Sequence, residues 1–142
     1  FNSTDINLSK EIKAVVDDYN DFITTKKLKV NLTTDDKFVV TANHSLINIL
    51  LSNLISNAIK HNIENGTINI ELKNNELIIL NTGNISNTDP NQFFKRFYKG
   101  SNSSDSVGLG LTIAKKICDL YDIEITNRIE DNVYNIGLIF PI

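Results

Sequence analysis

The sequence predicts an α+β fold, a two-layer sandwich in which a mixed, mostly antiparallel sheet carries helices on one face. Three observations favour this class. Segments with helical apolar spacing are separated along the chain, short alternating segments lie between them, and two pairs of those segments are joined by tight turns. With 142 residues the chain is expected to form one domain, residues 1–142, large enough for a substantial core.

Composition excludes several classes of protein. Apolar residues make up 41% and charged residues 22%, as in ordinary globular proteins. The net charge of −3 offers no electrostatic attraction to nucleic acid, so no nucleic-acid partner is expected. No apolar run approaches the ~20 residues that cross a bilayer, so no membrane contact by this domain is expected. Cys118, the single cysteine, lies in an apolar helical pattern and is expected in the core.

The expected elements follow as helix, strands, helix, hairpin, irregular segment, helix and hairpin. Helices are predicted from steps of three and four, and strands from alternation and β-branched residues. The ranges are a helix after an N-cap at Ser9, strands at 29–32 and 38–42, a central helix at 46–62 capped by Asn43 or Ser45, a hairpin at 67–72 and 76–80, a helix from Gly108, and a closing pair at 123–127 and 133–140.

The central helix ends in a polar face. Asn53 and Asn57 are one turn apart, and Lys60 or His61 follows at the next step, so these side chains share one side. A buried carboxamide is unfavourable unless its polar groups are bonded. Two of them beside a cation could hold a hydrated metal and phosphate. The alternative is that both asparagines cap or brace neighbouring loops.

Residues 81–107 form a long segment without periodicity. An irregular segment of about 27 residues is uncommon in a compact domain and is typical of a lid or binding loop. An insertion without function is the alternative, and the aromatic and basic cluster at 93–99 argues against it. Gly108-Leu109-Gly110 then opens a helix, where free N–H groups and the helix dipole favour phosphate.

In their order along the chain, these motifs resemble the ATP-binding catalytic domain of sensor histidine kinases, within the Bergerat-fold superfamily shared with gyrase-type ATPases. Residues 53–61 are similar to the N box, 81–83 occupy the place of the first glycine box, 94–98 are similar to the F box, and 108–111 match the end of the second glycine box. The resemblance covers nearly the whole chain. It implies the Bergerat ATP-binding fold, with a lid at about 82–107.

The resemblance also implies a role for each matched residue. Asn57 would hold Mg²⁺, while Asn53 and Lys60 would contact phosphate oxygens of ATP. His61 would line the nucleotide site near the sugar or base, and Asn81 would meet the adenine amino group. The other implied contacts are Gly83, Gly108, Leu109, Gly110 and Leu111 with the nucleotide, and Arg96 or Lys99 with the γ-phosphate when the lid closes.

Three positions depart from the family's pattern. Asn81 replaces the usual aspartate, Ile85 stands where the first glycine box loses its second glycine, and Ser106 stands where the second box normally begins with glycine. A carboxamide at position 81 can present either its oxygen or its NH₂ group. These departures leave open a second interpretation, a degenerate nucleotide-binding or docking module without catalytic activity.

The implied reaction transfers the γ-phosphoryl group of Mg·ATP to a histidine on the parent's dimerisation hairpin, which we expect outside these residues. ATP-hydrolysing relatives carry a glutamate where this chain has Asn53. Asn53 therefore favours a kinase over an ATPase, and it also counts against the rival anti-sigma type of Ser/Thr kinase.

The implied partners are the dimerisation hairpin, which carries the phosphoacceptor histidine, and the receiver domain of a response regulator. The domain is expected in the cytoplasm, with its parent anchored in the bacterial inner membrane. Without its hairpin, the isolated domain is expected to be inactive.

Overall fold

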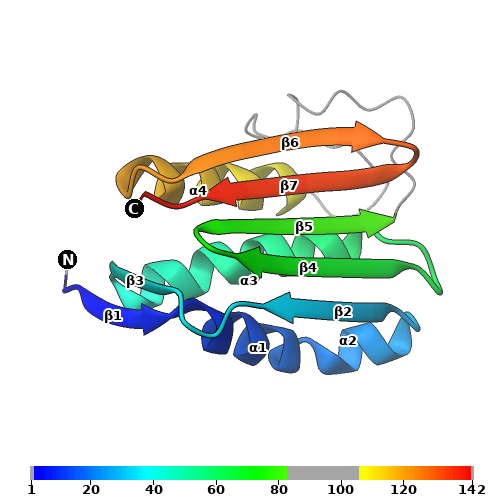
Figure 1. Cartoon of the computed structure of the whole chain (residues 1–142). Helices are drawn as coiled ribbons and strands as arrows, with labels where there is room; N and C mark the ends of the chain where they lie inside the picture. Colours follow the sequence, from blue (N-terminus) through cyan, green and yellow to red (C-terminus); the bar gives the residue numbers. More distant parts are fainter. Residues whose placement is uncertain (1, 83–105, 142) are drawn as a thin grey trace.

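The structure, a computed structural model, describes residues 2–82 and 106–141 and confirms the predicted two-layer α+β sandwich (Figure 1). No helix in these two ranges is both long and apolar enough to span a membrane. The elements are β1 (Thr4–Asn7), α1 (Leu8–Asp18), α2 (Asn20–Thr25), β2 (Lys29–Thr34), β3 (Val39–Ala42), α3 (His44–Lys60), β4 (Thr67–Lys73), β5 (Glu76–Thr82), α4 (Ser106–Leu120), β6 (Glu124–Glu130) and β7 (Val133–Ile139).

The main sheet has five strands in the order β2-β4-β5-β7-β6. Only the β2–β4 pair in it is parallel, and the other three neighbouring pairs are antiparallel. The two predicted pairs, at 67–80 and 123–140, are confirmed as β4–β5 and β6–β7. The β1 strand was not expected, and it pairs with β3 in a separate two-stranded sheet.

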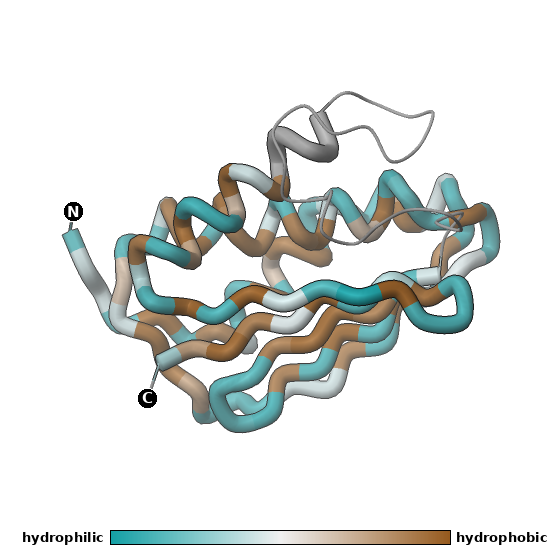
Figure 2. The backbone as a smooth tube through the Cα atoms, turned by 90° about the horizontal axis from the view of Figure 1, so that it is seen from above, coloured by the Kyte–Doolittle hydropathy of each residue, from teal (hydrophilic) through white to brown (hydrophobic). Residues whose placement is uncertain are grey.

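The helices cover one face of the main sheet, and the other face is open (Figures 1 and 2). Strand β4 shows why, because its residues alternate between buried and exposed. Ile68, Ile70 and Leu72 point into the core beneath the helices. Cys118 is buried there as predicted, and burial raises the pKa of its thiol to about 12.

The central helix α3 is enclosed on several sides. It packs against α1, α4 and β5. Both faces of its middle turns are therefore apolar, in contrast to a surface helix with a single apolar stripe. Its buried apolar residues are Ile47, Leu50, Leu51, Leu54, Ile55, Ala58 and Ile59.

Asn43, one of the two expected caps, begins α3. Its Oδ1 accepts a hydrogen bond from the backbone N–H of Leu46 at 3.0 Å, and its Nδ2 donates to the carbonyl oxygen of Asn2 at 3.1 Å. Its own backbone N–H donates to the hydroxyl of Tyr121 at 3.0 Å. The amino end of α3 is thus tied both to the beginning of the chain and to the segment after α4.

The expectation that Ser9 caps the first helix was wrong. Asn7 is the N-cap, and its Oδ1 accepts from the backbone N–H of Lys10 at 3.1 Å. Ser9 lies inside α1 and is only 1% exposed, with its Oγ 2.8 Å from Oδ1 of Asp36. Both residue types suit an N-cap, so the choice depends on a tertiary contact. The Ser9 hydrogen bond also helps to lower the pKa of the Asp36 carboxyl.

Gly66, in the turn between α3 and β4, has less space for a side chain than Gly137 in β7, so the two should differ in how much substitution by alanine destabilises the domain. A Cβ at Gly66 would overlap Oδ1 of Asn62 and lie 2.8 Å from the carbonyl oxygen of Ile63. We therefore expect Gly66→Ala to lower the free energy of unfolding by about 2–3 kcal/mol, measured with urea. Gly137→Ala is the control, because its Cβ would meet only Oγ1 of Thr126, at 2.9 Å. Equal losses in the two variants would contradict this account.

Candidate functional site

Three segments carry predicted site residues: the carboxyl end of α3, the end of β5 and the amino end of α4. The ends of α3 and β5 lie at one end of the molecule, and α4 points its amino end toward the same side (Figure 1). The arrangement follows from topology, because α3 packs against both β5 and α4. Of the residues predicted from sequence, Gly83, Arg96 and Lys99 lie outside the described residues.

Asn57 is the most unusual polar residue of α3. It is only 6% exposed, and its Oδ1 is fully enclosed and has no hydrogen-bond partner among the described residues. Leaving a buried oxygen unsatisfied costs about 1–3 kcal/mol. On the same helix, Asn53 is half-buried and Lys60 is exposed. The α3 face therefore offers an open acceptor inside the fold and a cation at its rim.

His61 follows the last residue of α3 and is half-buried. Its backbone N–H donates to the carbonyl oxygen of Asn57 at 3.1 Å. Burial, followed by the positive charges of Lys26 and Lys60, lowers the pKa of His61 from 6.5 to about 4. The imidazole is therefore neutral near pH 7, and one of its nitrogens is an acceptor.

Asn81 is 2% exposed near the end of β5. Its Nδ2 donates to the carbonyl oxygen of Thr82 at 3.1 Å, which leaves Oδ1 as the atom that can accept from a ligand. Flipping the amide would give up this bond, worth about 1 kcal/mol. Of the two orientations that the sequence allows, the structure has the one that resembles a carboxylate.

Sequence reasoning missed a network that joins the α3–β4 turn to β5. The Oγ1 of Thr82 donates to Oδ1 of Asn62 at 2.7 Å and accepts from the backbone N–H of Thr67 at 2.9 Å. The Nδ2 of Asn62 donates to the carbonyl oxygen of Thr67 at 3.1 Å. This network holds Thr82, the neighbour of Asn81, against the turn that follows His61. The sequence feature that could have indicated the network is the polar residue Asn62, directly after residues 53–61.

The glycine-rich motif lies in the first turns of α4. The helix begins at Ser106, ahead of the predicted start at Gly108, and includes Leu109 and Gly110. Helix ends commonly differ by one or two residues between assignments. Leu111 is fully buried, so its side chain contributes to the core.

A metal at this site would have Asn57 as its protein ligand. Among the described residues, no group of three or more His, Cys, Asp or Glu side chains could hold a metal ion. Mg²⁺ is usually held by one or two protein oxygens, with water and phosphate oxygens completing its octahedral shell. The buried, unbonded Oδ1 of Asn57 fits that requirement.

Residues 42–137 match the model of the histidine kinase-, DNA gyrase B- and HSP90-like ATPase family. The chain belongs to this family. It is 35% identical over 139 residues to the heme sensor protein HssS of Staphylococcus epidermidis. The matched region covers 95% of this chain and 31% of that protein. It is 32% identical over 142 residues to the sensor histidine kinase HprS of Escherichia coli. This match covers 94% of this chain and 31% of that protein.

Solved structures agree with this assignment. The nucleotide-free catalytic domain of histidine kinase ThkA superposes with a TM-score of 0.85 at 25% identity, covering 99% of this chain and 98% of that chain. ThkA bound to the response regulator TrrA gives a TM-score of 0.80 at 24% identity, covering 98% of this chain and 41% of that chain. The predicted family and fold are confirmed, and the chain is an ATP-binding catalytic domain of the histidine kinase type.

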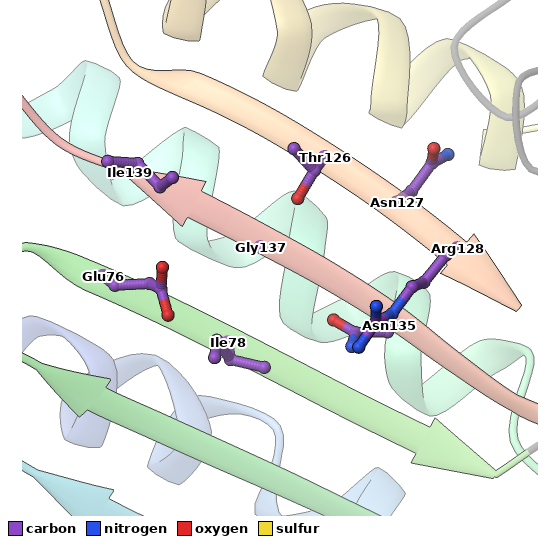
Figure 3. Close-up of a pocket in the computed structure, with 8 residues that line it drawn as sticks. All are labelled: Glu76, Ile78, Thr126, Asn127, Arg128, Asn135, Gly137 and Ile139. Atoms are coloured by element: carbon purple, nitrogen blue, oxygen red, sulfur yellow. The ribbon is translucent and has the colours of Figure 1, made fainter. Parts of the chain in front are cut away.

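A hollow of about 350 Å³ lies away from these residues, on the open face of the sheet opposite the helices (Figure 3). The side chain of Arg128 extends from β6 toward Asn135 on β7. The hollow is lined by Glu76, Ile78, Thr126, Asn127, Arg128, Asn135, Gly137 and Ile139. None of the predicted site residues of this histidine kinase domain lines it.

The lowered pKa of His61 predicts an acid sensitivity of the empty domain. The folded state resists protonation of this ring, so the unfolded state binds more protons between pH 6.5 and about 4. The contribution of His61 to the free energy of unfolding is therefore complete above pH 6.5, and it is lost as the pH falls toward 4. Allowing for solvent around the half-buried ring, the loss is about 1–2 kcal/mol.

Urea unfolding at several pH values would measure this loss. His61→Gln should remove it, while the losses due to carboxylates remain. His44→Gln, measured alongside, separates the contributions of the two histidines. If the stabilities of the parent domain and His61→Gln fall in parallel, His61 does not resist protonation.

Proposed function

We propose that this domain transfers the γ-phosphoryl group of Mg·ATP to a histidine on its parent's dimerisation hairpin, as the catalytic part of a two-component sensor histidine kinase. One observation supports this most. Asn57 keeps an unbonded oxygen inside the fold, on a helix that also carries a cation near its end and that packs against α4. Such an oxygen is unfavourable in the empty domain and useful to a bound cation.

Each residue of the site then has a positioning or electrostatic task. Asn57 would hold Mg²⁺, which would neutralise charge on the phosphates. Lys60 and Asn53 would bind phosphate oxygens from the α3 face, and the backbone around Gly108 and Gly110 would approach the triphosphate. Phosphoryl transfer depends mainly on such placement and charge neutralisation.

The base and sugar would lie beside His61 and Asn81. The neutral ring of His61 can accept a hydrogen bond, and the Oδ1 of Asn81 can accept from the adenine amino group. This orientation supports nucleotide binding despite the replacement of the usual aspartate. Arg96 and Lys99 remain candidates for the γ-phosphate from the sequence, together with Gly83 in the first glycine box.

Transfer to a histidine is favoured over hydrolysis because of Asn53. A carboxamide does not accept a proton from attacking water, as a glutamate would at that position. The same residue argues against the anti-sigma type of Ser/Thr kinase. A degenerate docking module remains the alternative that the phosphotransfer experiment below decides.

The parent protein and its partners belong to this proposal as well. The chain spans 31% of the length of HssS and of HprS, which are named as sensors. We place the domain in the cytoplasm, in a parent anchored in the bacterial inner membrane. A response regulator receiver domain would accept the phosphoryl group, and the solved complex of ThkA with TrrA supports that kind of partner.

The metal role of Asn57 predicts opposite changes in binding and stability. Asn57→Ala removes an unbonded buried oxygen, so the empty domain should unfold at an equal or higher urea concentration. Affinity for Mg·ATP should fall tenfold or more, by about 1.4 kcal/mol or more, in calorimetry. Asn48→Ala, on the same helix, is the control. Unchanged Mg·ATP affinity in Asn57→Ala would rule out the assignment.

The phosphotransfer itself is tested in the parent chain with its hairpin present. Radiolabelled γ-phosphate should appear on the protein as a phosphohistidine, which is labile in acid and stable in base. Asn57→Ala should abolish the labelling. ATP binding without any labelled histidine would indicate a docking module, whereas continuous phosphate release without a phosphohistidine would indicate an ATPase.

A further inference from the structure

Lys26 connects the end of α2 to the end of α3. Its Nζ donates to the carbonyl oxygens of Ile59, at 2.9 Å, and of Lys60, at 3.0 Å. Its backbone carbonyl accepts from the N–H of Asn65, at 3.0 Å. One residue therefore holds both the last turn of α3 and the turn that follows it.

The last turn of a helix leaves four carbonyl groups without partners inside the helix. In α3, the backbone N–H of His61 bonds the carbonyl of Asn57, and that of Asn62 bonds the carbonyl of Ile59. Lys60 is the last helical residue and no glycine follows it, so the common αL cap is not used. Lys26 bonds the carbonyl groups of Ile59 and Lys60 from outside the helix, with a cation that suits the negative end of the helix dipole.

We propose that Lys26 is a positioning residue for the nucleotide site. By capping α3 from α2, it fixes the turn from which Lys60 and His61 reach the nucleotide. This inference rests on the proposed binding of Mg·ATP at that end of α3. Lys26 itself does not touch the nucleotide in this account, and it acts through the backbone of α3.

The charge of Lys26 also acts on the ring of His61. The charges that act on this ring are Lys26 from α2 and Lys60 from α3, and both add to the effect of burial in lowering the pKa of His61. Glu64, in the following turn, is paired with Lys27 at 3.8 Å. The same cation thus bonds carbonyl groups at the end of α3 and adds positive charge beside His61.

The surroundings of Lys26 allow a clean substitution. A hollow of about 730 Å³ opens between α2 and the end of α3. Lys26 is half-buried beside this hollow, and burial lowers the pKa of its ammonium group. Methionine keeps an apolar stem of similar length but has no N–H to donate. The hollow is lined by Asp21, Phe22, Thr25, Lys26, Ile59, Lys60 and Glu64.

The experiment compares Lys26→Met, Lys26→Arg and the matched control Lys27→Met, in which the neighbouring exposed lysine loses its charge. The first measurement follows the exchange of the backbone amide hydrogens of His61 and Asn62 by NMR in the empty domain, because these amides donate to carbonyl groups in the last turn of α3. Lys26→Met should speed this exchange about tenfold, since the helix end loses its cap. Lys26→Arg should largely keep the exchange slow, and Lys27→Met should leave it unchanged.

The second measurement follows the affinity for ATP at about pH 7. Lys26→Met should weaken binding about fivefold, because the turn that carries Lys60 and His61 loses its cap. Lys26→Arg should keep the affinity, because its guanidinium can also donate to both carbonyl oxygens. Lys27→Met should bind ATP as the parent domain does.

Two results would overturn the inference. One is amide exchange at His61 and Asn62 in Lys26→Met that matches Lys27→Met, and the other is ATP binding that is unchanged by Lys26→Met. If Lys26→Met does not fold, Lys26→Gln replaces it, because its shorter side chain loses the charge, and it should speed the same amide exchange. A parent domain that binds no ATP would refute the proposed function, while amide exchange in the empty domain would still decide whether Lys26 holds the end of α3.

Discussion

The burial of α3 is the constraint on which the rest of the structure depends. The helix is held by α1, α4 and the sheet through apolar side chains on several faces, so its rotation about its own axis is fixed. A polar residue at a given position in such a helix cannot turn away to find water. Asn57 is held in this way, with its oxygen enclosed and unbonded among the described residues. Local strain of this kind, supported by a well-packed core, is typical of binding sites.

The direction of α3 explains the charges around its end. A helix presents partial negative charge at its carboxyl end, which disfavours a neighbouring polyanion. Lys26 and Lys60 add two positive charges at that end of α3, and α4, which packs against α3, points its partially positive amino end toward the same side. The neutral state of His61 follows from burial, which lowers its pKa most, and then from the same two charges. Structure and electrostatics at this end are therefore set by the same few residues.

The sequence predicted those parts of the fold that depend on periodicity along the chain. The burial of Ile68, Ile70 and Leu72 follows directly from alternation. Features that depend on contacts across the fold were not predictable in this way. Asn7 and Ser9 are both good caps, and they are distinguished by the contacts of Ser9 with Thr34 and Asp36 inside the fold.

The candidate site shows the same division. Steps of three and four placed Asn53, Asn57 and the residues after them on one face of α3, and the order of the motifs indicated the family. The sequence could not show that the amide of Asn81 is oriented by the carbonyl of Thr82, or that Lys26 reaches α3 from another helix. Each of these depends on a distance between atoms of different elements or on the rotamer of one side chain.

The bonds of Asn43 have a mechanical consequence. They connect the amino end of α3 to Asn2 and to Tyr121, while the opposite end carries Asn57 and His61. A helix of 17 residues is a stiff rod about 25 Å long. A tilt of about 5° at the Asn43 pivot would displace the far end by roughly 2 Å, more than a metal–ligand bond tolerates. Tension or torque applied to the first residues of the chain would therefore be amplified by leverage at Asn57, the proposed metal ligand.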